Sequence, residues 1–375
     1  LFSWKQTTSP MQTTVEQSHL SSALGLAQTV APVRRIKPIL ANVFLQAEGE
    51  HLRCSATDLI VSLTEQIPAT VTTGGSITVN ARDFNGIIRN LPGGSCSLKG
   101  DANHNLELSA PSARFNLVGM SEADFPSLPD PKSVDFSTVP AHLLSDLIQK
   151  TTFSVSDDEA RVNLNGALLQ SDGSHASTVS TDGHRLTYFK LPFAGPKLKK
   201  DVIIPRKGMV EIRKVLERVS GDVDVGFSKD HVFVRSEALL LSVKLNDVAF
   251  PPYAQVIPKA HTRVVLVDRE HLLANLRLAQ QLAPERASTV KLDISEEEMV
   301  LTADNPDKGV AELKLPVSLE GEPLVTGFNA TYLTEAVEAC DTDQVRMEFQ
   351  GELDPCVVRP SEGPELLAVV MPMRI

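Results

Sequence analysis

Three stretches, Ser18-His19-Leu20, Ala141-His142-Leu143-Leu144 and Glu270-His271-Leu272-Leu273, carry the same histidine–leucine pair at a predicted helix start. The histidines at positions 19, 142 and 271 are 123 and then 129 residues apart. One such pair has little meaning by itself, because an internal repeat must keep its period at several landmarks. The repeat hypothesis therefore depends on further motifs at the same spacing.

Three more landmarks keep this period. A threonine–aspartate pair recurs as Thr57-Asp58, Thr181-Asp182 and, more loosely, Ala303-Asp304. An extended run that leads into an apolar helix ends at Asn80, Pro205 and Asn329, which are 125 and 124 residues apart. The first two units close with Asp124-Phe125-Pro126 and Ala249-Phe250-Pro251. The agreement of four landmarks indicates one structural unit repeated three times.

Length and composition agree with three soluble domains. The chain has 375 residues, of which 42% are hydrophobic and 22% charged, and no apolar run is long enough to span a bilayer. We therefore expect a cytoplasmic protein. The repeat predicts domains at residues 11–135, 136–262 and 263–375. Residues 1–10 precede the first repeat and are expected to be an extension or a cloning remnant.

Each unit has the same predicted order of elements. An amphipathic helix opens the unit, with apolar residues at three- and four-residue spacing, as in Leu143, Leu144, Leu147 and Ile148. Strands separated by hairpin signals follow, for example at Glu48-Gly49-Glu50, and a second helix and further strands complete the unit. The predicted fold class is α+β, with two helices packed on small antiparallel sheets in each domain.

The sequence argues against an enzyme. Ser180, Asp182 and His184 are only two residues apart, whereas a catalytic triad is normally assembled from distant segments. The acidic run 157–159 could bind a metal, although a solvated loop is the simpler explanation. The four cysteines have no metal-binding or disulfide-framework spacing and are expected to be free thiols. We therefore predict no catalytic residue, no metal and no cofactor.

Four motifs resemble the bacterial DNA polymerase III beta subunit family, the sliding clamps. They are Thr181-Asp182-Gly183-His184-Arg185-Leu186, Val202-Ile203-Ile204-Pro205-Arg206-Lys207-Gly208, Phe250-Pro251-Pro252-Tyr253 and Val369-Val370-Met371-Pro372-Met373-Arg374-Ile375. The resemblance extends over residues 11–375. It implies a head-to-tail homodimer that closes into a ring around duplex DNA, with helices lining the hole. The implied function is a processivity factor that tethers the replicative polymerase, other polymerases and repair proteins to DNA. A separate clamp loader would load it, and the complex would lie in the cytoplasm, associated with the nucleoid.

The formal net charge of −11 is unusual for a protein that contacts DNA. A closed ring resolves this conflict, because topological retention needs little phosphate affinity. The resemblance implies DNA contacts by Arg34 and Lys207, and charge clustering suggests others, although a solvated helix face is the alternative for each. The predicted DNA-contacting residues are Arg34, Arg82, Arg161, Arg206, Lys207, Arg213 and Lys214. Val162 and Asn163 stand where well-known clamps carry aromatic residues.

The apolar C-terminal segment indicates a docking surface, with a last core strand as the alternative. The resemblance implies a hydrophobic cleft that accepts short peptides from client proteins. Its implied residues are Leu164, Thr181, Gly183, His184, Arg185, Leu186, Pro251, Tyr253, Val256, Asn329, Tyr332, Val369, Val370, Met371, Pro372, Met373 and Arg374. Gln255 stands where some relatives have arginine, so the charge at the rim of the cleft can differ.

The resemblance also implies the dimer interface. Phe115 and Leu117, on an edge strand of the first domain, are expected to meet Gln281 and Leu282 in the third domain of the partner. Two alternatives remain at this point: an enzyme on a repeated α+β scaffold, and a clamp paralogue that sequesters a clamp-directed antibiotic.

Overall fold

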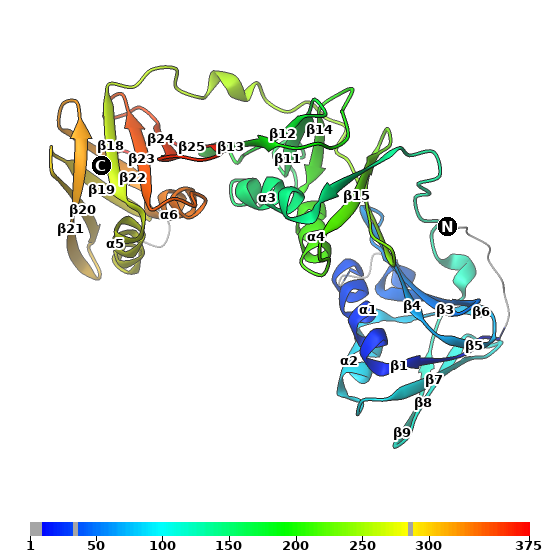
Figure 1. Ribbon diagram of the computed structural model, residues 1–375. Coiled ribbons are helices and arrows are strands. Elements are labelled where there is room, and N and C mark those ends of the chain that lie inside the picture. The colour runs from blue at the N-terminus through cyan, green and yellow to red at the C-terminus, as the bar shows by residue number, and fades with distance from the viewer. Residues whose placement is uncertain (1–9, 33–36, 284–287) are drawn as a thin grey trace. The chain divides into compact units, whose positions relative to one another are not determined.

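The computed structural model describes residues 10–32, 37–283 and 288–375, and these contain six α-helices, two in each predicted repeat. The predicted extension, apart from Pro10, lies outside the described residues. The helices are labelled in Figure 1: α1 (Gln17–Val30), α2 (Ala81–Asn90), α3 (Ala141–Thr152), α4 (Arg206–Leu216), α5 (Arg269–Leu282) and α6 (Ala330–Glu338). The two helices expected in each repeat are therefore confirmed.

The helix starts explain why the asparagine landmarks recur. The Asn80 side chain accepts a hydrogen bond from the Asp83 amide at 3.0 Å, and Asn329 accepts from two amides at the start of α6. Each asparagine satisfies backbone donors that a helix start leaves free. Each also ends a strand, so the strand-to-helix turn is fixed at the same place in the first and third repeats.

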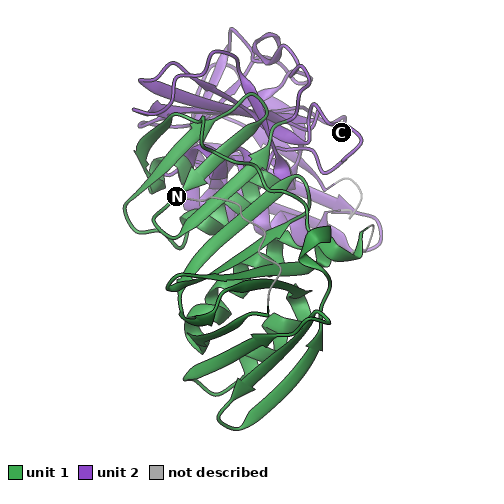
Figure 2. Cartoon of the chain, turned by 90° about the vertical axis from the view of Figure 1, so that its right-hand side faces the viewer, with its two compact units in different colours: residues 1–145, 207–245 green, residues 146–206, 246–375 purple. Residues whose placement is uncertain are grey.

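The chain forms two compact units, coloured separately in Figure 2: residues 1–145 with 207–245, and residues 146–206 with 246–375. The first unit holds a five-stranded antiparallel sheet in the order β5-β1-β7-β8-β9. Its strands are β1 (Gln12–Glu16), β5 (Thr70–Thr73), β7 (Ser95–Gly100), β8 (Asn105–Ala110) and β9 (Ala113–Val118).

An eight-stranded antiparallel sheet, in the order β10-β15-β16-β17-β4-β3-β2-β6, completes the first unit. Its strands are β2 (Asn42–Glu48), β3 (His51–Thr57), β4 (Val61–Pro68), β6 (Gly75–Asn80), β10 (Phe136–Pro140), β15 (Asp222–Phe227), β16 (His231–Arg235) and β17 (Leu239–Lys244). Helix α1 packs against β3, β4 and α2, so the apolar face predicted for it is core.

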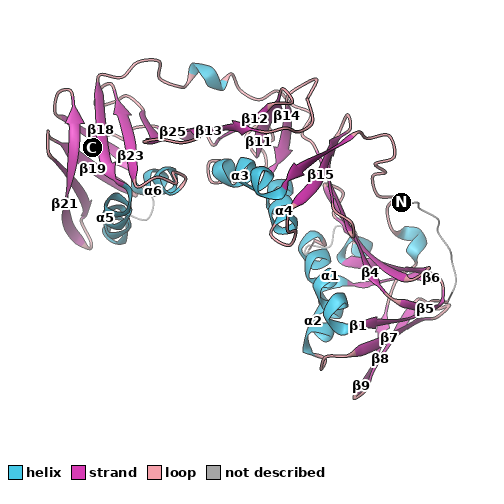
Figure 3. Ribbon diagram, in the orientation of Figure 1, coloured by secondary structure: helices cyan, strands magenta, loops and turns pink. Residues whose placement is uncertain are grey.

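The second unit holds a twelve-stranded sheet in the order β14-β11-β12-β13-β25-β24-β23-β18-β21-β20-β19-β22. Its strands, drawn in magenta in Figure 3, are β11 (Gly166–Ser171), β12 (His175–Thr181), β13 (Arg185–Pro192), β14 (Val202–Pro205), β18 (Arg263–Asp268), β19 (Thr289–Ile294), β20 (Glu298–Asn305), β21 (Gly309–Glu320), β22 (Leu324–Asn329), β23 (Gln344–Phe349), β24 (Cys356–Pro360) and β25 (Glu365–Val370). Helix α5 packs against β20, β21 and α6.

The sheets are larger than two small sheets per repeat, because strands pair across the borders between repeats. β4 of the first repeat pairs with β17 of the second, and β13 of the second pairs with β25 of the third. Each border is therefore a continuous hydrogen-bonded sheet. The hairpin predicted at Glu48-Gly49-Glu50 joins β2 to β3, and Gly49 has the positive φ of +62° that favours glycine.

None of the described helices combines the length and apolarity that a membrane crossing needs.

Candidate peptide-binding cleft and nucleic-acid contacts

An apolar cluster lies where β13 pairs with β25. Leu186 stands directly opposite Val369 in this pair, and both side chains are almost fully buried. The cluster joins side chains from six strands: Leu168, Val179, Leu186, Ile203, Val357, Leu367 and Val369. Four larger side chains pack against it and remain partly exposed: Tyr188, Phe250, Tyr253 and Ile257. A buried apolar floor under partly exposed aromatic rings is typical of a ligand-binding surface.

The tight turn before Leu186 is held by two side chains. Asp182 accepts hydrogen bonds from the amides of His184 and Arg185 at 2.9 and 3.1 Å, and Thr181 accepts one from Gly183. Gly183 has a φ of +94°, which explains why glycine stands there. The turn therefore presents His184 as an exposed side chain beside the cluster.

Arg185 has a different environment, because its side chain is only 11% exposed. It forms ion pairs with Asp182 at 3.0 Å and with Glu335, and its guanidinium lies over the Tyr332 ring at 4.3 Å. Tyr332 also stacks with His184. Arg185 therefore connects the turn to α6 and acts on the cleft by positioning its neighbours.

The linker between the second and third repeats forms one rim of the cleft. It includes the short helix η3 (Tyr253–Gln255), and the Tyr253 hydroxyl donates a hydrogen bond to Gln170 at 2.9 Å. The Tyr253 ring stacks with Tyr188, and burial raises the pKa of both tyrosines. Val256 follows with 48% of its surface exposed, and is thus available to a partner.

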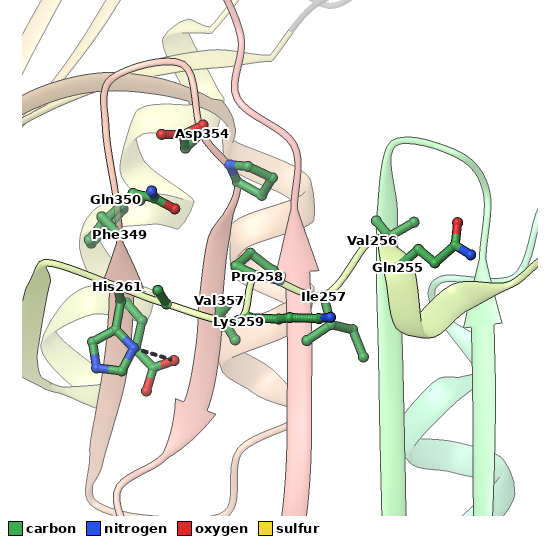
Figure 4. A pocket seen from close by; sticks show the side chains of 13 residues that line it. Gln255, Val256, Ile257, Pro258, Lys259, His261, Phe349, Gln350, Asp354 and Val357 are labelled. Carbon is green, nitrogen blue, oxygen red and sulfur yellow. Dashed lines mark ion pairs between the residues drawn. The ribbon is translucent and has the colours of Figure 1, made fainter.

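Farther along the linker, residues 255–261 line a pocket of about 300 Å³ together with residues 348–350, 354, 355 and 357 (Figure 4). His261, at one end of this segment, forms an ion pair with Glu348 at 3.7 Å. Burial opposes ionisation of Glu348, but hydrogen bonds from Arg346 and Arg359 outweigh it and lower its pKa. The pocket therefore has an ionised carboxylate on one wall.

The C-terminal tail leaves the sheet and docks on β22. The Met371 amide donates to the His184 carbonyl at 3.0 Å, and the Met373 amide donates to the Gly327 carbonyl at 2.8 Å. A Cβ at position 327 would lie 2.2 Å from an Ile375 side-chain carbon, so this close approach requires glycine. Met371 remains 39% exposed beside the apolar cluster.

All of the implied cleft residues lie in the second unit, but they differ in burial. Leu164, Leu186, Val369 and Val370 are buried, and of these Leu186 and Val369 belong to the apolar floor, whereas His184, Val256 and Met371 are exposed. The alternative interpretation of the C-terminal segment holds for β25, which is a core strand, whereas the residues after it are partly or fully exposed, and the docking surface stays a prediction. Asn329 caps α6 and Thr181 holds the turn, so their hydrogen bonds are structural.

Sequence reasoning missed four residues of this site: Gln170, Tyr188, Phe250 and Ile257. Tyr188 is one of only three tyrosines in the sequence, and this rarity was an available signal. The partner of the Tyr253 hydroxyl, Gln170, lies 83 residues away, and no local pattern identifies it.

The predicted DNA-contacting residues on and beside α4 are paired with acids. Arg206 pairs with Asp157, Lys207 with Asp58, Arg213 with Glu217 at 3.4 Å and Lys214 with Glu211 at 2.8 Å. Glu211 and Asp58 are largely buried, whereas the Arg213 side chain is 44% exposed and its partner 60%. Arg213 is therefore the member of this group that is freest to exchange an acid for a phosphate.

The other predicted DNA contacts have separate environments. Arg82 is exposed in the first turn of α2. Arg161 donates to the Asp182 carbonyl at 3.0 Å and so lies against the turn beside the cleft. Val162, next to Arg161, is 45% exposed. This position, where well-known clamps carry an aromatic residue, therefore presents a smaller apolar side chain to solvent. Arg34 lies outside the described residues.

Two of the four predicted interface residues are exposed and two are half-buried. β9 is the terminal strand of the five-stranded sheet as described, and Phe115 on it is 36% exposed. Leu117 is half-buried. Gln281 and Leu282 end α5, where Gln281 is exposed and Leu282 half-buried.

The residues considered for catalysis are separated or structural. Ser180 is fully buried and contacts Ser154, while His184 is exposed on the turn. All four cysteines are buried and free. Burial raises the pKa of Cys340 to about 12 and that of Cys54 and Cys356 well above the usual range, so these thiols are poor nucleophiles.

Family comparisons cover all three repeats. Residues 11–129, 138–252 and 254–374 match, in this order, the N-terminal, central and C-terminal domains of the DNA polymerase III beta subunit. The Beta sliding clamp of Caulobacter vibrioides is 33% identical over 373 residues, which covers 97% of this chain and 100% of that protein.

Solved structures give the same result. The C. crescentus beta sliding clamp, with PEG bound to its putative beta-motif tethering region, is 32% identical with a TM-score of 0.92, covering 98% of this chain and 100% of that one. A Pseudomonas aeruginosa sliding clamp bound to griselimycin is 29% identical, also with a TM-score of 0.92 and the same coverage. The resemblance and the three-domain fold predicted from the sequence are thereby confirmed. This chain belongs to the DNA polymerase III beta subunit family, the sliding clamps.

Proposed function

We propose that this chain acts as a DNA sliding clamp by closing with a second copy into a ring around duplex DNA and holding client proteins in the cleft between β13 and the C-terminal tail. Sliding clamps are non-catalytic processivity factors of the DNA polymerase III holoenzyme, so the expected non-enzymatic function follows from membership of the family. The ring, the cleft and the DNA contacts of this chain are the parts that experiments must test.

The single observation that carries the proposal is the apolar cluster with its incomplete cover. Val256 and Met371 are 48% and 39% exposed beside a floor whose members Leu186 and Val369 are at most 2% exposed. Burying these two side chains against apolar residues of a peptide is favourable, and a few such contacts dominate interfaces of this kind. The occupant is therefore a short peptide with apolar residues, carried by a polymerase or another replication or repair protein.

The charges favour weak contact with DNA. Because each basic residue on α4 that we predict to touch DNA already has an acidic partner, phosphate binding must compete with an existing ion pair. Such contacts suit a protein that slides, since tight phosphate binding would oppose movement. Retention on DNA would then come from ring closure.

The proposed ring is formed by a homodimer, is loaded by a clamp loader and encircles duplex DNA. We place the complex in the cytoplasm on the nucleoid. The test is sedimentation of the purified protein, followed by loading onto nicked circular DNA with a clamp loader and ATP. We expect a dimer that remains on circular DNA in about 0.5 M salt and leaves linear DNA through its ends. High salt is used because exposed charges are screened beyond about 10 Å already at about 0.1 M, so ionic contacts alone would not hold the protein on DNA. Equal loss from both DNA forms would contradict the ring.

The paralogue alternative is not favoured. The Caulobacter vibrioides Beta sliding clamp matches this chain along its whole length. A solved clamp bound to griselimycin shows only that a sliding clamp can bind that compound. Stimulation of a polymerase by the purified protein would separate the two functions.

A further inference from the structure

The opening strand of the second repeat has an edge that no described strand covers. β1, β10 and β18 lead directly into α1, α3 and α5, and each pairs on one edge with β7, β15 or β23, the strand after the second helix of its repeat. The other edge of β1 is covered by β5, and that of β18 by β21. β10 has no such cover and is the terminal strand of its sheet.

The sequence explains why the second repeat lacks a covering strand. In the first and third repeats the covering residues follow Pro68 and Pro316, and the equivalent proline is Pro192, 124 residues from each. After Pro192 the backbone turns, because the Gly195 amide donates to the Phe193 carbonyl at 2.9 Å. A proline follows, which has no N–H group for a ladder. These residues therefore form no strand.

The free edge presents backbone groups at defined positions. Residues of an antiparallel strand point their N–H and C=O groups alternately toward one neighbour and the other. The Ala141 amide donates to the Gly221 carbonyl at 2.9 Å, so every second residue before it, including Ser137, faces β15. The backbone groups of Phe136 and Thr138 therefore point away from β15, along the free edge.

The strands that cover the equivalent edges show which side chains suit this position. Val71 of β5 stands opposite Thr13, and Leu319 of β21 stands opposite Val265. Thr13 and Val265 are fully buried beneath this cover. The equivalent residue of β10 is Ser137, which is only half-buried. A covering strand would therefore place an apolar side chain opposite Ser137.

The surface beside the free edge is acidic. A hollow of about 780 Å³ at the start of β10 is lined by five acidic and two basic side chains. Both bases are already paired, Lys132 with Asp130 and Arg235 with Asp224, each at 2.9 Å. The acids that have no ion pair within the described ranges are all exposed: Asp135, Asp222 and Glu237. Charge complementarity therefore favours a partner that carries lysine or arginine.

We propose that an extended segment of a partner protein, in which apolar and basic residues alternate, adds to the free edge of β10 as an antiparallel strand. Adding a strand to an open edge is a common way to bind a peptide. The apolar residues would cover Ser137, and the basic residues would lie on the other face of the sheet, where Asp222 stands opposite Pro140. This surface is separate from the cleft, and the interaction goes beyond the proposed function.

A short fluorescein-labelled peptide that alternates lysine with valine is the probe. Fluorescence anisotropy with the full-length protein at low salt should show binding at least about tenfold tighter than that of the same peptide with glutamate in place of lysine. Equal affinities, or no binding, would overturn the proposal. Because the protein has a formal net charge of −11, charge alone could attract this probe, so the backbone edge needs its own test.

Methylation of the peptide backbone tests the edge on the wild-type protein. Each lysine of the probe stands opposite Phe136 or Thr138, so its amide points toward β10, whereas each valine amide points away. N-methylation of the lysine amides should weaken binding about tenfold, because ladder hydrogen bonds are lost. N-methylation of the valine amides is the matched control and should change affinity less than about threefold. Equal effects of both peptides would overturn strand addition.

A substitution tests the same edge from the side of the protein. Thr138→Pro removes an N–H group that points away from β15, and proline is tolerated on edge strands, so the variant should fold and bind the lysine–valine peptide about tenfold more weakly. Thr138→Val is the control, since it removes only the hydroxyl that bonds Asp224 at 2.8 Å and keeps the N–H group. Wild-type affinity in both variants would overturn the proposal.

The other candidate occupant is a second copy of this chain. Sedimentation of Thr138→Pro and the wild type should show the same oligomeric state, because a partner protein and not a second copy covers this edge. A lower oligomeric state in Thr138→Pro than in Thr138→Val would assign the edge to self-association and overturn the partner.

Discussion

The two borders between repeats are built from equivalent strands but have opposite chemistry. Where β13 meets β25, the side chains are Leu186, Tyr188 and Val369, with Val179 on the neighbouring strand β12. The equivalent positions where β4 meets β17 hold Ser62, Thr64 and Ser242, with Ser55 on the neighbouring strand β3, and all four are buried. The hydroxyls there satisfy one another, with Ser55 bonded to Thr64 at 3.0 Å and Thr57 to Ser62 at 2.8 Å.

The covers of the two borders differ as well. Phe125 and Leu128 are 6% and 8% exposed and complete a small cluster in the first unit, whereas their counterparts Phe250 and Tyr253 stay partly exposed. At the polar border the hydroxyls are hydrogen-bonded and the cover is buried, so a ligand would form few new favourable contacts there. At the apolar border the cover is partly exposed, so a ligand would remove apolar surface from water. The repeat therefore supplies the scaffold at both borders, and a few side chains make only one of them a binding site.

Among the changes that we consider, removing the C-terminal tail should reduce peptide binding at the apolar border most strongly. Deletion of residues 371–375 removes Met371 and its hydrogen bond to the His184 carbonyl. We expect affinity for a fluorescent client peptide to fall at least about 100-fold, because loss of a central contact can exceed 2 kcal/mol. Sedimentation should still report a dimer. Unchanged affinity in a folded dimer would show that the tail does not form the site.

Exchanging residues between the borders should alter stability unequally. Leu186→Ser introduces the side chain found at position 62 into an apolar floor and should cost about 3 kcal/mol in free energy of unfolding. Ser62→Ala removes one hydrogen bond and should cost about 1 kcal/mol. Urea denaturation measures both. Leu186→Asp would damage the fold for the same reason, so it is a poor probe of binding.

A surface substitution separates binding from folding. Val256→Asp should weaken peptide binding about tenfold by setting a carboxylate against apolar peptide atoms. Its melting temperature should match that of the wild type, because Val256 is half exposed. Ile60→Asp is the control at the other border, since Ile60 is 45% exposed on the turn before β4, which corresponds to the turn before β13. Equal weakening by both variants would contradict a site confined to one border.

The basic residues should show the smallest effects. Arg213→Gln should lower the slope of log affinity for DNA against log salt by about one per contact, with unchanged stability. Lys207→Gln should instead cost about 1 kcal/mol of stability, because Asp58 on the polar border loses its ion-pair partner and keeps only its hydrogen bonds from the Ile60 and Val61 amides. If only Lys207→Gln lowered the slope of log affinity against log salt, Lys207 would be the DNA contact and Arg213 would not.

Much of the fold could be predicted, because the repeat and the helix starts are local patterns. The strand-to-helix turns at Asn80 and Asn329 and the hairpin at Gly49 depend on neighbouring residues. Pairing of β4 with β17 depends on residues more than 170 positions apart, and no local pattern encodes it.

The sequence suggested candidate residues for the site, but it did not show which surface they form. Val256 and Leu186 are both apolar in sequence, and only packing shows that one is rim and the other floor. The acids that pair with Arg206 and Lys207 are 49 and 149 residues away, so the basic cluster looked freer than it is.

Hydrogen–deuterium exchange with and without a client peptide tests the central claim most directly, because the two borders serve as site and control in one molecule. We predict slower exchange in residues 183–187, 253–257 and 367–373 when peptide is bound, and no change in residues 59–63, 128–132 and 240–244. Equal protection of both borders, or protection at the polar border alone, would contradict the account.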